Sequence, residues 1–405
     1  METKKAWYQS LLFKLVLGIA VGIGLGLIAN ESTMQVVGSL KALLGQLISY
    51  CVPLIILGFI TPAIVGLKEN AGKMLSVTLI IAYLSSIGAA IFSMASGYAI
   101  IPSLNIATDV AGTREMPTLL FNLNISPIMP VITALVTSVF FGLAILRTRS
   151  ITMENLFSEL NRVVLWLVDK VVLSILPVFI AATFATLAYE GGIIHQLPIF
   201  LTVILIVIVG HYIWLALLYL IGGAISKTNP MKVLGKYGPA YVTALGTMSS
   251  AATLSVALKC AKKAPTLDAK IRDFVVPLCA NCHLCGSVLT EVFFVMTVSQ
   301  LLYGALPAVG SMVLFSLLLG IFAIAAPGVP GGTVMASLGL ITGVLGFDAN
   351  GIALMLSIFA LQDSFGTACN VTGDGAIALM ITGLFKKVPG RNGNPPHVDE
   401  AEAAV

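Results

Sequence analysis

Long apolar segments make up most of the chain, and short polar connections separate them. Residues 11–29, LLFKLVLGIAVGIGLGLIA, and residues 197–224 are two examples. An α-helix needs about 20 apolar residues to cross roughly 30 Å of hydrocarbon, whereas the strands of a membrane barrel would show about ten residues of alternating polarity. The pattern therefore predicts an all-α membrane protein. We interpret residues 11–29 as a retained helix and not a signal peptide, because the run is long, rich in glycine and lacks a small-residue cleavage site.

The pattern changes after residue 225, where glycine, proline and serine interrupt the apolar runs. Up to that point the chain reads as six plain spans. Residues 243–263 hold two short apolar arms around Met248, Ser249 and Ser250, and residues 315–346 hold two arms around APGVPGG. A helix broken at membrane depth is tolerated only where it is buried or lines a cavity. We therefore predict two re-entrant hairpins, each followed by a long span, and eight transmembrane helices in total.

The two long spans after the hairpins share a local pattern. NCHLCGS at 281–287 aligns with ACNVTGD at 368–374, which pairs Cys282 with Cys369 and Gly286 with Gly373. The two hairpin-plus-span units would cross the membrane in opposite directions. Inverted repeats of this kind are typical of secondary transporters, with the binding site at mid-membrane between broken helices.

Composition and charge support this class and set the orientation. The chain is 58% hydrophobic and 10% charged, against roughly 25% charged residues in a soluble domain. Connections around residues 30–41, 102–125, 188–196, 303–310 and 347–350 carry only Lys41 and Arg114, so they are predicted to lie outside. The alternate, cytoplasmic connections carry Lys4, Lys5, Lys68, Lys73, Arg147, Arg149, Arg162, Lys227, Lys232, Lys236, Lys259 to Arg272, Lys386, Lys387 and Arg391. We therefore expect a cell-membrane protein with both termini in the cytoplasm, whose net charge of +4 does not indicate a nucleic-acid partner.

The stretch CANCHLCGS, residues 279–287, raises a rival hypothesis. It contains the C-x-x-C-H pattern of covalent haem attachment, and its cysteines and histidine also resemble a zinc or iron-sulfur site. A membrane redox protein built on this cluster is therefore the alternative from another functional class. However, the stretch lies inside a span that follows a basic loop, and cysteines at every third position fan across roughly 120° of a helix and converge poorly on one metal. We expect no haem and no transition metal.

A polar stripe marks the last span. In residues 361–375, Asp363, Thr367, Asn370 and Asp374 fall at offsets that place them on one face of an otherwise apolar helix. An ionisable residue at membrane depth is costly and usually functional, so the two aspartates are candidates for ligand or ion binding. The alternative is a buried carboxylate that neighbouring hydroxyl and backbone groups satisfy. Glu291 in the seventh span is open to two interpretations, a structural acid or a proton site.

Three motifs carry a resemblance to a known family. SSAATL at 249–254, GVPGG at 328–332 and NVTGD at 370–374 resemble the dicarboxylate/amino acid:cation symporter family, the glutamate transporter homologues. The resemblance covers most of the chain, is densest between residues 243 and 380, and implies a transporter and not an enzyme. It further implies a homotrimer in which a transport domain moves like an elevator against a fixed scaffold. The implied division is 1–225 for six spans, mostly scaffold and trimerisation with part of the transport domain, 237–386 for the transport core, and 387–405 for a cytoplasmic tail.

The resemblance also implies roles for residues of the polar stripe and the hairpin tips. Asp363 would pair with the α-ammonium of an amino acid, and Thr367 and Asn370 would contact its backbone. The implied substrate-binding set is completed by Ser249, Ser250, Ala251, Ser287, Val329, Gly332 and Gly366.

Gly366 departs from the family pattern. Members that carry acidic substrates have an arginine here, whose planar fork binds a side-chain carboxylate. Met248 also stands where other members place an arginine on the first tip. A second substrate carboxylate would be desolvated and unpaired, at a cost of several kcal/mol. We therefore predict a neutral amino acid, with serine or threonine first and a larger side chain admitted by the space at Gly366. A dicarboxylate transporter of the same fold is the alternative.

For the coupling ion, the resemblance implies Na⁺ at two sites. The first uses Asp374 with the carbonyls of Asn370, His283 and Cys279; the second uses carbonyls of Ala323, Ile324 and Ala326 together with Asn281. A third family site needs an asparagine and an aspartate, which are His283 and Cys285 here, so we expect one or two coupled Na⁺ ions. His283 is open to two interpretations, a proton-coupled residue, which makes proton-coupled transport an alternative, or a buried structural histidine.

Overall fold

The computed structural model is all-helical, and no strand occurs in the residues that it describes. This confirms the all-α part of the predicted fold class. The described residues are 11–65, 73–104, 106, 114–121, 123–191, 193–326, 328 and 330–385. The predictions for Lys4, Lys5, Lys68, Lys386, Lys387, Arg391, Val329 and the 387–405 tail lie outside them. The helices are α1 (Leu11–Ile28), α2 (Glu31–Val65), α3 (Lys73–Ile100), η2 (Ile101–Leu104), α4 (Val131–Thr148), α5 (Ile151–Leu167), η3 (Val168–Val172), α6 (Leu173–Tyr189), α7 (Ile193–Ser226), α8 (Met231–Leu234), α9 (Gly238–Thr247), α10 (Ser250–Lys262), α11 (Ala269–Cys282), α12 (Cys285–Tyr303), α13 (Val309–Ala325), α14 (Gly332–Gly343) and α15 (Ala349–Phe385).

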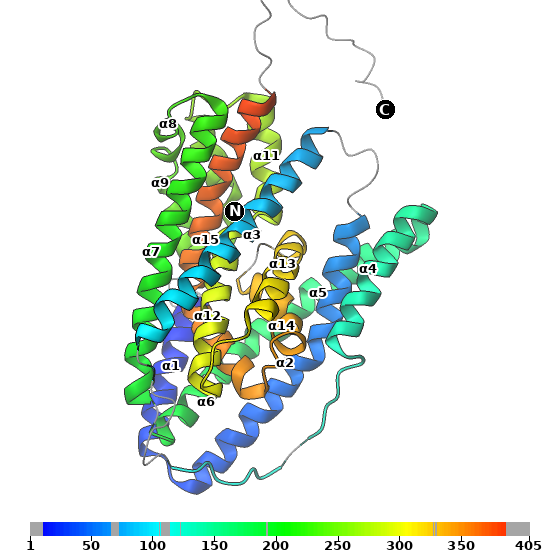
Figure 1. The fold of residues 1–405 in the computed structure, drawn as a ribbon. Coiled ribbons are helices and arrows are strands. Elements are labelled where there is room, and N and C mark those ends of the chain that lie inside the picture. The colour runs from blue at the N-terminus through cyan, green and yellow to red at the C-terminus, as the bar shows by residue number, and fades with distance from the viewer. Residues whose placement is uncertain are drawn as a thin grey trace, which may run out of the picture.

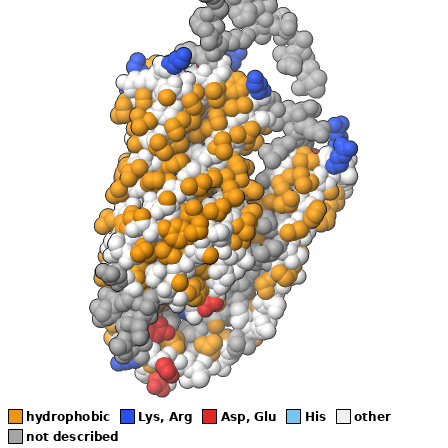
Figure 2. All heavy atoms as spheres, viewed as in Figure 1, with side chains coloured by type: hydrophobic (Ala, Val, Ile, Leu, Met, Phe, Trp, Pro, Cys, Tyr) orange, Lys and Arg blue, Asp and Glu red, His pale blue; other side chains and the backbone are white. Residues whose placement is uncertain are grey.

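Six helical stretches in the described residues are long and apolar enough to cross a membrane. They are Glu31–Pro62, Lys73–Leu104, Ile151–Tyr189, Leu197–Ser226, Ala269–Tyr303 and Ala349–Phe385. Shorter apolar helices include Phe13–Ile28, Val136–Thr148 and the two arms of the second hairpin. Figure 2 shows hydrophobic side chains along the visible flank, with most of the visible Lys and Arg near its upper end and the acidic side chains near its lower end. The membrane class follows from these observations, and the total of eight spans remains a prediction.

The connection that the sequence places at residues 30–41 is much shorter than expected. Helix α2 begins at Glu31, so residues 31–41 are helical and only Ala29 and Asn30 join α1 to α2. The Asn30 side chain accepts a hydrogen bond from the Thr33 backbone N–H at 2.9 Å, which is how a capping residue starts a helix.

The helices pack into two groups. The first bundle is α1, α2, α4, α5 and α6, and the second bundle is α3, α7 and α9 to α15. In Figure 1 the second bundle includes α7, α11 and α15 on the left, whereas α2, α4 and α5 of the first bundle lie on the right. The two groups meet where α14 packs against α2 and α4, and where α15 packs against α1 and α6.

Helix α1 lies directly on the backbone of α6. A Cβ atom added to Gly18, Gly22 or Gly26 would collide with the backbone carbonyl oxygen of Pro177, Ala181 or Ala185 on α6, whereas Gly24 has open space around it. Small residues four positions apart permit this close approach between membrane helices. The first bundle is therefore built on a seam that tolerates only glycine.

Each of the two stretches predicted to form a re-entrant hairpin folds as a pair of short helices, and their re-entrant placement in the membrane stays a prediction. The first hairpin, α9 and α10, starts at Gly238 and turns at Met248, which has a left-handed φ of 53°, and at Ser249, which caps α10. The second hairpin, α13 and α14, turns between Ala326 and Gly331. The first hairpin packs mainly against α11 and α15, whereas α14 of the second lies against the first bundle. The second hairpin is therefore held between the bundles, and the outer face of α10, with Ala251 and Ala252, is exposed.

The span that follows the first hairpin is broken, and the span that follows the second is continuous. Helix α11 ends at Cys282, and His283 and Leu284 take non-helical backbone angles before α12 begins at Cys285. Helix α15 runs unbroken from Ala349 to Phe385. The break gives α12 a free N-terminus within the protein interior, opposite the polar stripe on α15.

Candidate functional site

The four residues of the predicted polar stripe lie on α15 and are buried. Asp363 and Thr367 are 4% exposed, and Asn370 and Asp374 are 1% exposed. Bulk water does not reach polar groups at this depth, so each side chain depends on partners inside the protein, on a ligand or on a buried water. Their contacts divide the stripe into an upper part around Asp374, a middle part around Asn370 and a lower part around Asp363.

Asn370 holds the free N-terminus of α12. Its side-chain oxygen accepts hydrogen bonds from the backbone N–H groups of Gly286 at 2.8 Å and Ser287 at 3.2 Å. Its side-chain amide donates to Ser287 Oγ at 2.9 Å. The predicted substrate residues Asn370 and Ser287 are therefore in direct contact, and a ligand bound here would have to share or replace these bonds.

Asp363 lies where the two hairpin tips meet. Its carboxylate accepts a hydrogen bond from the backbone N–H of Gly331, in the second tip, at 2.7 Å. Ser249 of the first tip donates through Oγ to the carbonyl of Gly328 at 2.6 Å, and the N–H of Ala251 donates to the same carbonyl at 3.3 Å. The tips are thus joined to each other and to Asp363.

The space beside Asp363 is small in this conformation. A cavity of about 10 Å³ is bounded by Asp363, Met248 and Gly331 together with Leu15 of α1 and Leu173 and Leu176 of α6. A single water needs about this volume, so an amino acid does not fit without movement of a tip. Among the described residues no Lys or Arg lines this cavity.

His283 occupies the upper part of the stripe. Its ring nitrogen Nδ1 lies 2.9 Å from Asp374 Oδ1 and donates to it, because a carboxylate only accepts. The other ring nitrogen, Nε2, lies 2.9 Å from Ser85 Oγ on α3. The imidazole is fully buried. One oxygen of the predicted cation ligand Asp374 is therefore engaged by a side chain of the protein itself.

Gly366 is closely packed against α12, so there is no open space beside it. A Cβ atom at this position would lie 3.3 Å from Ser287 Cα and 3.4 Å from Ser287 Oγ. The space that the sequence suggested at Gly366 is therefore taken by the first turn of α12 in this conformation. A larger side chain at residue 366 would have to move α12.

The remaining predicted residues are the substrate residues at the hairpin tips and the predicted cation ligands. Ser250 and Gly332 are buried next to the tips, and Val329 lies outside the described residues. The carbonyl of Cys279 already accepts a hydrogen bond from the His283 N–H at 2.9 Å. Asn281 is exposed, and its side-chain amide donates to the Pro277 carbonyl at 3.1 Å. Ala323 and Ile324 lie in the last turn of α13, with Ala326 just beyond it, and α13 packs against α11, which carries Asn281.

Three polar contacts were not predicted from the sequence. The first is the contact of Ser85 with His283. In the second, His211 on α7 lies 3.0 Å through Nε2 from the Gly286 carbonyl, at the start of α12. In the third, Ser337 on α14 donates to Glu291, whose second carboxylate oxygen has no hydrogen-bond partner among the described residues. The only signal in the sequence is a polar residue within an apolar run, which does not identify the partner.

The cysteines of CANCHLCGS are divided by the helix break. Cys279 and Cys282 belong to α11, whereas Cys285 begins α12 and lies with Cys369 near the close α12–α15 approach at Gly286 and Gly373. Within the described residues, no three His, Cys, Asp or Glu side chains form a group that could hold a metal ion. The arrangement offers buried thiols next to the polar stripe.

Comparisons with known proteins agree with these observations. The model of the sodium:dicarboxylate symporter family matches residues 11–384. The putative sodium-dependent excitatory amino acid transporter glt-4 of Caenorhabditis elegans is 28% identical over 251 residues, which cover 61% of this chain and 49% of the relative. Excitatory amino acid transporter 1 of Ambystoma tigrinum is 29% identical over 258 residues, 62% of this chain and 46% of the relative. Human excitatory amino acid transporter 2 is 28% identical over 193 residues, which cover 47% of this chain and 33% of the relative. The matched region spans less than half the length of each relative.

Proposed function

The chain belongs to the sodium:dicarboxylate symporter family, and we propose that it is a secondary active transporter that couples a neutral amino acid to Na⁺. Membership confirms the resemblance carried by the motifs, and the family is one of transporters and not of enzymes. The observation that carries the substrate proposal is the position of Asp363, at the junction of both tips, with no described Lys or Arg beside it.

The substrate proposal follows from charge balance. Asp363 can pair with the α-ammonium of an amino acid, and the tip N–H groups can hold the α-carboxylate. A side-chain carboxylate would then stand without a cation at a buried position, which costs several kcal/mol. The relatives are named as excitatory amino acid transporters. We nevertheless propose serine or threonine, because glycine stands at position 366.

The transport cycle that we propose moves the second bundle against the first. The first hairpin has an exposed outer face, and the second hairpin is wedged against α2 and α4. The first tip can therefore open here by breaking the Ser249–Gly328 hydrogen bond, whereas the second tip is blocked. Because the basic connections are assigned to the cytoplasm, this conformer would release substrate inward. We propose that three copies assemble in the cell membrane, with both termini in the cytoplasm.

Cation coupling is proposed at two places. Asp374 keeps one oxygen that His283 does not engage, and it can contribute that oxygen to the first Na⁺ site. The carbonyls after α13 can supply the second, near Asn281. His283 and Cys285 replace the ligands of the third site, so we propose fewer coupled ions than the full family pattern.

Uptake measurements on purified protein in proteoliposomes test the proposal. Labelled serine should accumulate with an inward Na⁺ gradient and not when K⁺ replaces Na⁺, and unlabelled threonine should compete while aspartate should not. Potent competition by aspartate alone would refute the neutral substrate. Accumulation that ignores Na⁺ and follows a proton gradient instead would establish the proton-coupled alternative.

Variants at position 366 separate charge from packing. Gly366→Ala adds only a Cβ against Ser287, so serine uptake should fall while aspartate remains a poor competitor. The side chain of Gly366→Arg must displace the first turn of α12, and its planar cation can bind a side-chain carboxylate, so aspartate should become the better competitor. If both variants respond to aspartate in the same way, the charge argument at this position is wrong.

A further inference from the structure

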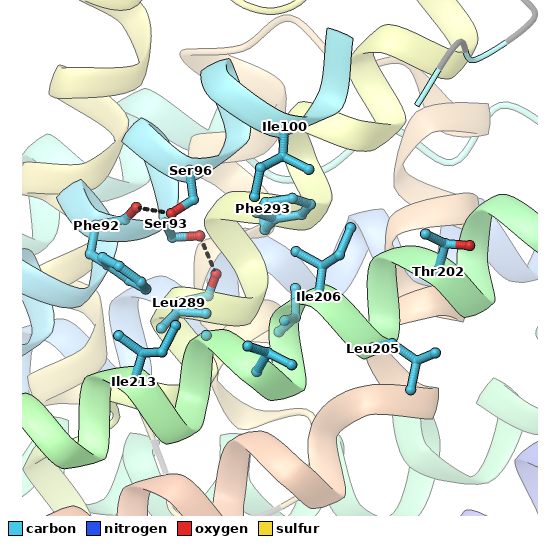
Figure 3. A pocket seen from close by; sticks show the side chains of 13 residues that line it. Phe92, Ser93, Ser96, Ile100, Thr202, Leu205, Ile206, Ile213, Leu289 and Phe293 are labelled. Carbon is cyan, nitrogen blue, oxygen red and sulfur yellow. Dashed lines mark hydrogen bonds between the residues drawn. The ribbon is translucent and has the colours of Figure 1, made fainter. Parts of the chain in front are cut away.

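A groove on the membrane-facing side of the second bundle lies away from the polar stripe. It has a volume of about 360 Å³ and is bounded by α3, α7 and α12 (Figure 3). Along α7 it extends from Thr202 to Ile213, which is about 16 Å of helix at 1.5 Å per residue. Along α3 it extends from Phe92 to Ile100. The groove is therefore long enough for a chain-like molecule.

Among its described lining residues the groove offers a ligand no free hydroxyl donor. Its hydroxyl groups are engaged by backbone carbonyls: Ser93 donates to Leu289 at 2.7 Å, Ser96 to Phe92 at 2.8 Å and Thr202 to Pro198 at 2.8 Å. The other lining residues are apolar or glycine. Water needs two to four polar partners in a cavity, and an amino acid needs more. The ligand that fits is therefore apolar.

The rim of the groove continues the lipid-facing surface of α7. Leu205, Val209 and Ile213 are 63%, 57% and 50% exposed, and α7 is one of the helices long enough to span the membrane. The groove also reaches Ile100, four residues before the end of the Lys73–Leu104 span, so it follows the outer part of that span. Acyl chains are the apolar, elongated molecules present at this surface.

We propose that this groove binds one acyl chain of a bilayer lipid as a defined ligand, and not merely as solvent. The acyl chain lies against Leu289 and Phe293 of α12. The backbone of α12 is joined to α3 by the Ser93–Leu289 hydrogen bond. Leu289 is three residues after Gly286, which Asn370 holds at the substrate site. The acyl chain thus supports the helix that carries the first turn of that site.

Gly210 provides the variant that tests the groove. A Cβ at this position would lie in ordinary contact with Leu289 and Phe92, at 3.4 and 3.7 Å, so a leucine side chain at residue 210 would extend into the groove. Gly24 on α1 is exposed and has open space around it, so Gly24→Leu adds the same atoms elsewhere on the lipid-facing surface. Thr202→Phe, at the exposed rim, narrows the entrance without changing the interior.

The experiment reconstitutes the full chain with a phosphatidylethanolamine that carries a photoreactive diazirine on its acyl chain. After irradiation, peptide mapping should show labelling within residues 202–213 and 289–293 at least fivefold above that of Leu217 and Leu220, which are exposed on α7 outside the groove. Gly210→Leu and Thr202→Phe should each reduce the groove labelling several-fold, and Gly24→Leu should leave it unchanged. Even labelling along α7, or groove labelling that both groove variants leave unchanged, would overturn the proposal. If Gly210→Leu aggregates during size-exclusion chromatography, the labelling of Thr202→Phe alone tests the proposal. Labelling does not depend on which substrate the protein carries.

Discussion

Replacing His283 with asparagine should make the stability of the protein depend more strongly on Na⁺. The imidazole donates to Asp374 Oδ1 and contacts Ser85 Oγ, both at 2.9 Å, in a fully buried position. Asparagine keeps a donor but is shorter, so it cannot reach both partners from the same backbone position. The variant therefore weakens the hold on one carboxylate oxygen of Asp374, which a cation can then engage.

The magnitude follows from these two contacts. A hydrogen bond to a charged group contributes about 1.5–3 kcal/mol, and breaking a buried pair outright costs about 3–5 kcal/mol. Because asparagine retains part of the contact, we expect His283→Asn to lower the free energy of unfolding by about 2–3 kcal/mol in KCl. A cation that binds only the folded state returns about 2.7 kcal/mol at one hundred times its dissociation constant. NaCl should therefore restore most of the loss.

Thermal unfolding of the detergent-solubilised protein measures this effect, with tryptophan fluorescence as the signal and NaCl exchanged for KCl at constant ionic strength. His211→Asn is the matched control, because it also replaces a buried imidazole but lies against Gly286 and not Asp374. It should destabilise the protein equally in both salts. Replacing KCl with NaCl should raise the unfolding temperature of His283→Asn more than that of the wild type and of the control. If it does not, the imidazole does not occupy the place of a cation at Asp374.

Three further changes test the tips and the stripe. Ser249→Ala removes one hydrogen bond to Gly328, worth about 1 kcal/mol, so the open population of the first tip should rise about fivefold, measured by hydrogen exchange of α9 and α10. Asp363→Asn removes the charge that would pair with the α-ammonium, so amino acid affinity should fall at least tenfold in ligand-dependent thermal shifts, with unfolding without ligand little changed. Asn370→Ala leaves the N–H groups at Gly286 and Ser287 unpaired, so stability should fall by about 1–3 kcal/mol, and Asn370→Asp, which keeps the acceptor, should lose less.

The amino-acid sequence was sufficient to predict an all-helical membrane protein, and it was least reliable for where the helices begin and end. Continuous apolar runs identify membrane helices because the bilayer requires every backbone group to be bonded within the segment. The ends depend on single capping contacts. Asn30 starts α2 ten residues before its apolar run becomes obvious, and the first hairpin begins at Gly238 because Pro239 fits the first turn of a helix.

The site shows the same division between local and long-range information. The polar stripe on α15 follows from helical periodicity, so the amino-acid sequence is enough to group Asp363, Thr367, Asn370 and Asp374. The contact of His283 with Ser85 joins residues 198 positions apart, and no periodic pattern encodes it. The break at His283 and Leu284 was also hidden, because neither residue is a glycine or a proline.

The glycine seam between α1 and α6 constrains the order in which the protein can be assembled. Roughly 150 residues separate the two helices, so at 5–20 residues per second a ribosome needs about 8–30 s to deliver α6 after α1 has entered the membrane. During that interval the flat glycine face of α1 has only lipid or an insertion factor as its neighbour. A substitution at Gly22 should therefore act during synthesis, as a defect in yield, before it is visible in transport.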